Sequence, residues 1–103
     1  MAVKIVIERR VSRENERALL QLLKELRVRC LEEPGYISGE TLRDSEDPRT
    51  IVVISSWFGL MDWRRWSHSP ARAEIESQIR PLLLAEERAR VLLEGLSDVH
   101  SGA

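Results

Sequence analysis

The residues of this chain best suited to holding a ring-shaped compound are Trp57, Trp63 and Trp66, together with Tyr36. Indole rings give flat apolar walls, and their N–H group can orient one ligand oxygen. Large aromatic side chains also anchor protein cores and subunit interfaces. For Trp57 we favour this packing role, whereas for Trp63 and Trp66 both interpretations stay open. Tyr36 is expected to pack at the start of a strand, with a hydroxyl that could reach a pocket.

Polar groups that could act on such a compound are few. Histidine exchanges a proton near neutral pH, so His68 is the candidate general base for deprotonating a phenol. No carboxylate stands at a spacing that would orient it, which favours a solvent-facing loop position instead. Arg72, with Arg64 and Arg65, could attract an anionic substrate, although basic residues on a short helix are usually solvated or paired. Cys30 has no activating neighbour and is interpreted as a small buried apolar residue.

Several motifs of common enzyme classes are absent from the sequence. It contains no glycine-rich phosphate loop, no paired metal-ligand spacing, no nucleophile elbow and no dinucleotide fingerprint. These absences argue against phosphoryl transfer, zinc-dependent hydrolysis and nicotinamide chemistry. We therefore expect neither a metal site nor a bound cofactor.

The charge balance and the cysteine content are those of an ordinary cytoplasmic protein. The 103 residues include 16 Lys+Arg and 17 Asp+Glu, without the cationic surplus typical of nucleic-acid binding. The single cysteine cannot form an intrachain disulfide, and residues 1–4 lead into a strand without a signal-peptide pattern. No apolar run is long enough to span a bilayer. We expect a cytoplasmic protein that binds neither nucleic acid nor membrane.

The elements that must position these residues follow from the apolar periodicity. Alternating and β-branched runs predict four strands, over residues 3–9, 36–43, 51–58 and 89–94. Apolar residues at three- and four-residue spacing predict three helices, over about 13–32, 60–66 and 70–80. Ser12 is the expected N-cap of the first helix, and Ser69, before Pro70, that of the last.

This order of elements predicts an α+β fold, a ferredoxin-like βαββαβ plait with helices on one face of an antiparallel sheet. Residues 1–96 form the expected domain, and 97–103 a frayed or disordered tail. If Val52 and Ile54, or Val53, point away from the helices, the bare sheet face is apolar and must be covered. A second copy is the simplest cover, so we expect a homodimer through this face.

The sequence also resembles the antibiotic biosynthesis monooxygenase family of dimeric α/β barrels, over roughly residues 3–94. The resemblance rests on a helix-closing turn, a strand-ending tryptophan, an aromatic helix and a Ser-Pro step, in the segments 34–36, 52–57, 63–66 and 69–72. It implies two identical chains packed sheet to sheet, each with a pocket between its sheet and its helices. Characterised members include cofactor-free monooxygenases of phenols and quinols, and others that degrade haem.

The pattern of the family's polyketide-type monooxygenases is an Asn on the third strand, a Trp four residues later, an aromatic six beyond that, and an Arg in the next helix. Trp57 matches the tryptophan, and Trp63 stands where Tyr is expected. The Asn position falls on Val53, which has no polar atom to hold a substrate oxygen. The Arg position falls near Ser77, with Arg72 about one helical turn before it.

The pattern of the haem-degrading members fits less well. Trp66 matches their tryptophan, but the position of the haem-binding histidine falls at Ile75 or Glu76. His68 is only two residues past Trp66, and the one asparagine, Asn15, belongs to a predicted helix rather than to the first strand. Haem iron needs an axial ligand, so the sequence argues against haem degradation.

Two functions from different classes remain open at this point. The leading hypothesis, implied by the resemblance, is a cofactor-independent monooxygenase of an aromatic or quinol-like compound, walled by the three tryptophans and assisted by His68 or an arginine. The alternative is a non-catalytic dimeric module that binds a small molecule or serves as an accessory protein. The lack of a convincing acid–base pair favours the alternative.

Overall fold

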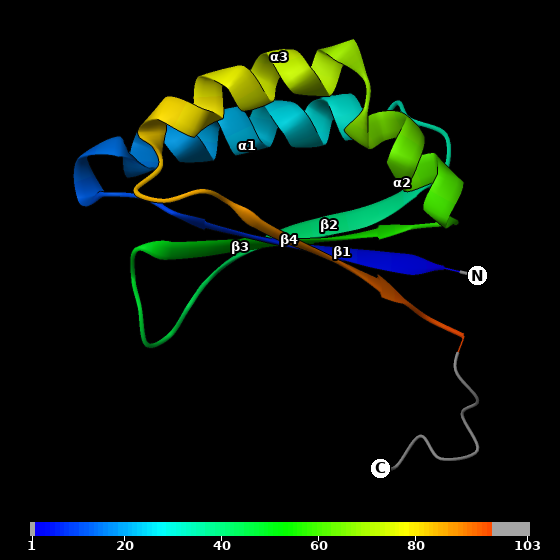
Figure 1. The fold of residues 1–103 in the computed structure, drawn as a ribbon, viewed down its shortest axis with the longest axis horizontal. Coiled ribbons are helices and arrows are strands. Elements are labelled where there is room, and N and C mark those ends of the chain that lie inside the picture. The colour runs from blue at the N-terminus through cyan, green and yellow to red at the C-terminus, as the bar shows by residue number, and fades with distance from the viewer. Residues whose placement is uncertain (1, 96–103) are drawn as a thin grey trace.

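A computed structural model of the chain describes residues 2–95 (Figure 1). The elements are β1 (Val3–Arg10), η1 (Arg13–Asn15), α1 (Glu16–Cys30), β2 (Tyr36–Arg43), β3 (Thr50–Trp57), α2 (Leu60–Ser67), α3 (Pro70–Ile79), η2 (Arg80–Leu82) and β4 (Arg88–Leu93). Their order confirms the predicted α+β, ferredoxin-like plait. The tail predicted over 97–103 lies outside the described residues. No helix among residues 2–95 combines the length and the apolar character that a bilayer crossing requires.

The four strands form one antiparallel sheet in the order β2-β3-β1-β4, which is not closed into a barrel. Burial alternates along β1, where Val3, Ile5 and Ile7 are buried and the residues between them are not. These buried residues face the helices, and their partners across the strand pairs share that face. Figure 1 shows α1 and α3 side by side over the sheet, with α2 at one end.

The first helix begins later and ends earlier than the periodicity predicted, and its expected cap is absent. Residues 13–15 form the 3-10 turn η1, and α1 ends at Cys30. The N–H of Asn15 donates to the backbone oxygen of Ser12 at 3.1 Å, so the tightened turn satisfies a donor without the serine side chain. The Ser12 hydroxyl makes no capping bond and is buried without a partner. The prediction that Ser12 caps the helix was therefore wrong.

The cap predicted for the last helix is confirmed. Ser69 Oγ accepts a hydrogen bond from the backbone N–H of Arg72 at 3.1 Å, and Pro70 occupies the first turn of α3. A proline there removes an N–H that would have no helical partner and sets φ for the helix. This cap fixes where α3 begins, and so places Arg72 on the side of the helix that faces the sheet.

The core lies between the sheet and the helices in two adjoining groups. One gathers around the aromatic end of the sheet and contains Val3, Ile5, Ile7, Cys30, Trp57, Trp63 and Trp66. The other fills the opposite end and contains Val11, Leu19, Leu23, Ile51, Ile75 and Ile79. Trp57 is fully buried, which confirms its predicted packing role. Large buried rings and branched residues account for most of the stabilisation in a chain of this length.

The other face of the sheet carries no helix, and its centre is apolar. Val6 pairs with Ile54, and Leu42 pairs with Val52, so these four residues share that face. The two alternatives posed by the sequence are thereby resolved: Val52 and Ile54 point away from the helices, whereas Val53 lines a cavity beneath them. Charged residues border the apolar centre, namely Lys4, Glu8, Arg10, Glu40, Arg88 and Arg90.

Candidate functional site

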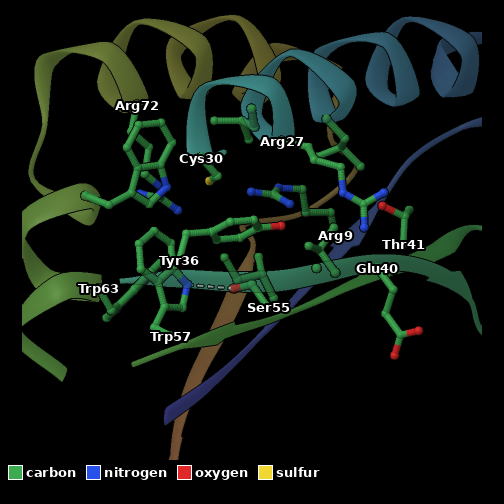
Figure 2. A pocket seen from close by; sticks show the side chains of 16 residues that line it. Arg9, Arg27, Cys30, Tyr36, Glu40, Thr41, Ser55, Trp57, Trp63 and Arg72 are labelled. Carbon is green, nitrogen blue, oxygen red and sulfur yellow. Dashed lines mark hydrogen bonds between the residues drawn. The ribbon is translucent and has the colours of Figure 1, made fainter. Parts of the chain in front are cut away.

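A cavity of about 60 Å³ lies between the aromatic end of the sheet and the helices. Its apolar walls come from α1, α2 and three strands, and they include all the aromatic residues singled out in the sequence: Tyr36, Trp57, Trp63 and Trp66. Figure 2 shows Trp57 and Trp63 on one side of the cavity with the ring of Tyr36 beside them, Arg27 and Arg72 reaching in from the helices, and Arg9 from the sheet. A space of this size holds a few water molecules in the structure as it stands.

The aromatic wall is held together by edge-to-face packing. The Tyr36 and Trp57 ring centroids are 5.2 Å apart at 72°, and those of Trp57 and Trp63 are 5.8 Å apart at 64°. The indole N–H of Trp57 donates to Ser55 Oγ at 3.1 Å. Because this donor is already satisfied, Trp57 offers a ligand only its apolar surface. Trp63 and Trp66 are both buried and both line the cavity, so they belong to the core, and their contact with a ligand stays a prediction.

The phenol of Tyr36 reaches across strand β2 and occupies the middle of the cavity (Figure 2). It lies against Gly39, where an added Cβ atom would come within 2.5 Å of the tyrosine hydroxyl. A side chain at this position would displace the hydroxyl, because the added Cβ atom would lie too close to it. The absence of a side chain at Gly39 therefore lets the Tyr36 hydroxyl enter the site.

Three arginines line the cavity, and they come from three different elements. Arg9 extends from β1, Arg27 from α1 and Arg72 from α3, whereas the side chain of Glu40, also on the cavity lining, points away from the cavity toward the open face of the sheet (Figure 2). The Arg72 guanidinium lies 5.3 Å from the centroid of the Trp63 ring, a cation–π contact that holds it against the wall. Such a surplus of guanidinium groups beside aromatic rings suits a ring compound with a negative charge.

Arg9 belongs to a buried group of charges behind the cavity. Its side chain is 2% exposed, and its Nη2 donates to Glu76 Oε1 at 2.7 Å. Glu87 Oε2 lies 3.2 Å from the same nitrogen without the alignment of a hydrogen bond. Arg72 Nη2 lies 4.0 Å from Glu76 Oε2 on the other side. A buried charge needs such partners, so each member of this group depends on the others.

The two carboxyl groups of this cluster differ in their affinity for a proton. Burial, together with a hydrogen bond to Glu76, raises the pKa of Glu87 to about 7. Burial also tends to raise the pKa of Glu76. The hydrogen bond with Glu87 and the positive charges of Arg9 and Arg72 together have a larger, opposite effect, so the pKa of Glu76 is lowered. The proton that the pair retains therefore resides mainly on Glu87, which is partly protonated near neutral pH.

Cys30 lies in the cavity wall as a neutral thiol. It is buried, and burial raises its pKa to about 12. A thiol that stays protonated at neutral pH is a poor nucleophile. This confirms the interpretation of Cys30 as a small apolar residue.

The structure brings together five of the six residues predicted for the site: Tyr36, Trp57, Trp63, Trp66 and Arg72. His68 is not among the lining residues. It is exposed at the end of α2, where its Nδ1 lies 2.8 Å from the Arg64 carbonyl oxygen. Nδ1 in that position donates to the last turn of the helix, which matches the solvent-facing alternative posed by the sequence.

Sequence reasoning passed over Arg9, Arg27 and Ser55 as site residues. The signal for Arg9 was available, because it continues the inward positions of Val3, Ile5 and Ile7 along one strand. Arg27 is exposed on α1 and has no such signal. Among residues 2–95, no three His, Cys, Asp or Glu side chains are grouped in a way that could hold a metal ion.

A family model described as antibiotic biosynthesis monooxygenase matches residues 2–77 of this chain. No curated protein sequence matches this chain. Among solved structures, the chain is similar to a conserved protein from Methanosarcina mazei Go1, with 20% identity, a TM-score of 0.86, and coverage of 92% of this chain and 94% of that chain. It is also similar to Rv0793 from Mycobacterium tuberculosis, with 16% identity, a TM-score of 0.83, and coverage of 94% and 98%.

A third similar structure is that of SnoaB, a cofactor-independent oxygenase from Streptomyces nogalater. The identity is 16%, the TM-score is 0.81, and the alignment covers 93% of this chain and 95% of that chain. At such identities the likeness shows a common fold, and the site residues have to be judged on their own. Val53 lines the cavity without a polar atom, and Ser77 is exposed on α3.

Proposed function

We propose a function for this chain from its membership of the antibiotic biosynthesis monooxygenase family, to which it belongs. It is a small-molecule monooxygenase that acts without a cofactor on an aromatic or quinol-like compound. The observation that carries the proposal is the cavity itself. Aromatic residues wall a space between sheet and helices, and guanidinium groups enter it from β1, α1 and α3. Apolar walls with a few convergent polar groups are the usual form of a small-molecule site.

The chemistry follows from the substrate more than from the protein. A phenol or quinol loses a proton, and the electron-rich anion reacts with dioxygen. In an anthrone, the keto tautomer of such a phenol, one atom of O₂ replaces the two hydrogens of the ring CH₂ group as a carbonyl, and the other atom leaves with those hydrogens as water. The protein has to favour the anion and exclude competing water. Arginines 9, 27 and 72 would stabilise the developing negative charge, and the indoles would hold the ring in place.

The cavity must widen to admit a ring. At about 60 Å³ it is well below the volume of a typical ligand site. Arg27 is exposed at its rim, so its side chain can swing outward without breaking a buried contact. Tyr36 is half-buried and reaches across the space. We therefore expect these two side chains to move on binding.

Oxygen consumption tests the proposal. We expect uptake above background with at least one of a panel of anthrones and hydroquinones, and no uptake across the panel would contradict it. Trp63→Ala should lower kcat/KM at least about tenfold, about 1.4 kcal/mol of transition-state stabilisation, because the ring loses its wall. Phe58→Ala, at an aromatic residue that is 72% exposed, serves as the matched control and should leave turnover unchanged.

Trp63 is also part of the core, so its loss can act through stability alone. Trp63→Phe keeps an aromatic ring, and its thermal unfolding midpoint separates the two effects. Lower turnover with an unchanged midpoint supports a substrate wall. A lowered midpoint with unchanged turnover of the folded fraction supports packing only.

One observation favours the non-catalytic alternative. Val53 occupies the cavity position where the monooxygenases of the family are expected to carry Asn, and it has no polar atom to hold a substrate oxygen. A binding module would bind aromatic compounds without consuming oxygen. Calorimetric binding of a quinol by a chain that shows no uptake would decide for this alternative.

The site is proposed to function within a homodimer. The open sheet face has an apolar centre, and a second copy packed sheet to sheet would cover it. Such packing would create the dimeric α/β barrel expected from the family. The cavity lies on the opposite side of the sheet, so each chain would keep its own site.

A further inference from the structure

We propose that the cavity binds its ring compound as an anion, a carboxylate or a phenolate, through Arg9, and that this binding takes up a proton at the Glu76–Glu87 pair. The inference deepens the function proposed above by naming the charge of the ligand. It rests on that function only in taking the same cavity as the ligand site.

The first support is the unused donor of Arg9. The side chain is 2% exposed and lines the cavity, yet its Nε–H has no hydrogen-bond partner in the described part of the chain. Buried donors of this kind are nearly always satisfied, by protein, water or ligand. An anionic oxygen placed in the cavity would supply the missing acceptor. Arg72, held over Trp63, lies ready to contact the same ligand.

The second support is the charge balance behind Arg9. Glu87, in the segment before β4, faces Arg9 of β1 and the residues Glu76 and Arg72 of α3. With both carboxyl groups ionised, the two guanidinium charges are cancelled. With a proton on Glu87, the four groups keep one positive charge. A bound anion therefore favours the protonated form, and the protonated form favours the anion, by the reciprocity of linked equilibria.

The third support is the position of Glu87 between cavity and solvent. Its side chain is 22% exposed and lines a surface hollow together with Arg80, Leu83, Ala85 and Glu86. It can thus exchange a proton with water from outside while the cavity is closed by a ligand. Because the pKa of Glu87 is about 7, this exchange falls in the neutral range.

Calorimetric titration of the full chain with 2-naphthoate tests the inference, and 2-naphthalenemethanol is the neutral control of the same shape. We expect naphthoate to bind at least about tenfold more tightly than the alcohol at about pH 6. Its Kd should weaken about tenfold between about pH 6 and about pH 8, since a proton must then be taken from solution. Titrations in two buffers of different ionisation enthalpy should give proton uptake on binding.

Three variants make the test specific. Glu87→Gln mimics the protonated carboxyl, so it should keep the tight binding and lose both the pH dependence and the proton uptake. Glu86→Gln makes the same change at an exposed neighbour and should behave like the wild type. Arg9→Lys keeps the charge but removes the Nε–H donor, and should weaken naphthoate binding while leaving the affinity for the alcohol unchanged.

Equal affinity for naphthoate and the alcohol would overturn the inference, and so would pH dependence that persists in Glu87→Gln. These results are independent of turnover. Oxygen uptake without preference for the anion would leave the proposed monooxygenase standing and refute this inference. Proton-linked naphthoate binding in a chain that never consumes oxygen would support this inference and refute the proposed monooxygenase.

Discussion

At the scale of single residues, the site is set by a few charged side chains in unusual places. Arg9 follows three buried apolar residues on the helix-facing side of β1. A charge buried there without partners would oppose folding, so Arg9 needs oppositely charged groups beside it. Glu76 and Glu87 supply those partners from elements far along the chain. Together with Arg72, Arg9 balances both carboxylates when they are ionised. The higher proton affinity of Glu87 therefore comes from its own burial and from its hydrogen bond with Glu76.

Glu87 should make stability fall as pH rises through the weakly acidic range. Its pKa is about 7 in the folded chain and near 4.5 when unfolded, so between these values the folded state binds more protons. The free energy of unfolding should therefore decline from about pH 4.5 to about pH 7 through this group, and then level off. Urea denaturation across this range measures it.

Glu87→Gln is the diagnostic variant for this effect, because it cannot ionise and should remove the decline. Glu16 and Asp47, each hydrogen-bonded to another side chain, have the opposite effect on stability. Hydrogen bonds to Arg43 and to Thr50 lower their pKa values, so their contribution is lost as pH falls below about 4.5. A decline that is unchanged in Glu87→Gln would show that another group causes it.

At the scale of elements, the turn between α1 and β2 places the aromatic wall. Gly35 has a φ of +86°, a conformation that residues with a side chain rarely adopt. Its carbonyl oxygen accepts the N–H of Phe58 at 2.7 Å, which ties the turn to the end of β3. Tyr36 follows directly and packs against Trp57. The turn thus aligns two strands and two rings at once.

Gly35→Ala should destabilise the chain by about 1–3 kcal/mol, because alanine resists the positive φ. Its Cβ atom would also lie 2.3 Å from Asp62 Cγ. Gly59→Ala is the matched control, since its φ of −152° is extended and its Cβ would meet Asp62 Oδ2 at an ordinary 3.5 Å. We expect the control to cost less than about 0.5 kcal/mol. Chemical denaturation of both variants checks the difference, and equal losses would contradict the argument from φ.

At the scale of the whole molecule, the plait leaves one sheet face without a cover. Its centre combines Val6, Leu42, Val52 and Ile54, and charged side chains surround them. A short chain buries a modest share of its surface, so a shared interface would add substantially to its stability. The charged border would set the register of two copies, while the apolar centre would provide the driving force.

Ile54→Lys should convert the proposed dimer into a monomer of about 11.9 kDa. It places a charge at the centre of the face, between Val6 and Glu40, and the cost of removing this charge from water on association opposes dimerisation. Light scattering at micromolar concentration reports the mass, and Lys4→Ala at the rim serves as the control. A wild-type chain that is already monomeric under these conditions would refute the proposed interface.

The sequence by itself determined the order of elements and the aromatic half of the site. Strand and helix periods are local, so they gave the elements, while residue type and the family resemblance indicated Tyr36, the three tryptophans and Arg72 as candidates. The end of α1 and the missing Ser12 cap were decided by hydrogen bonds of the backbone turn. Only the tertiary structure joined Arg9 to Glu76 and Glu87, which are 67 or more residues away, and left His68 outside the cavity. Burial and charge pairing depend on which segments, distant in the sequence, come into contact in the fold. A local sequence pattern does not contain this information.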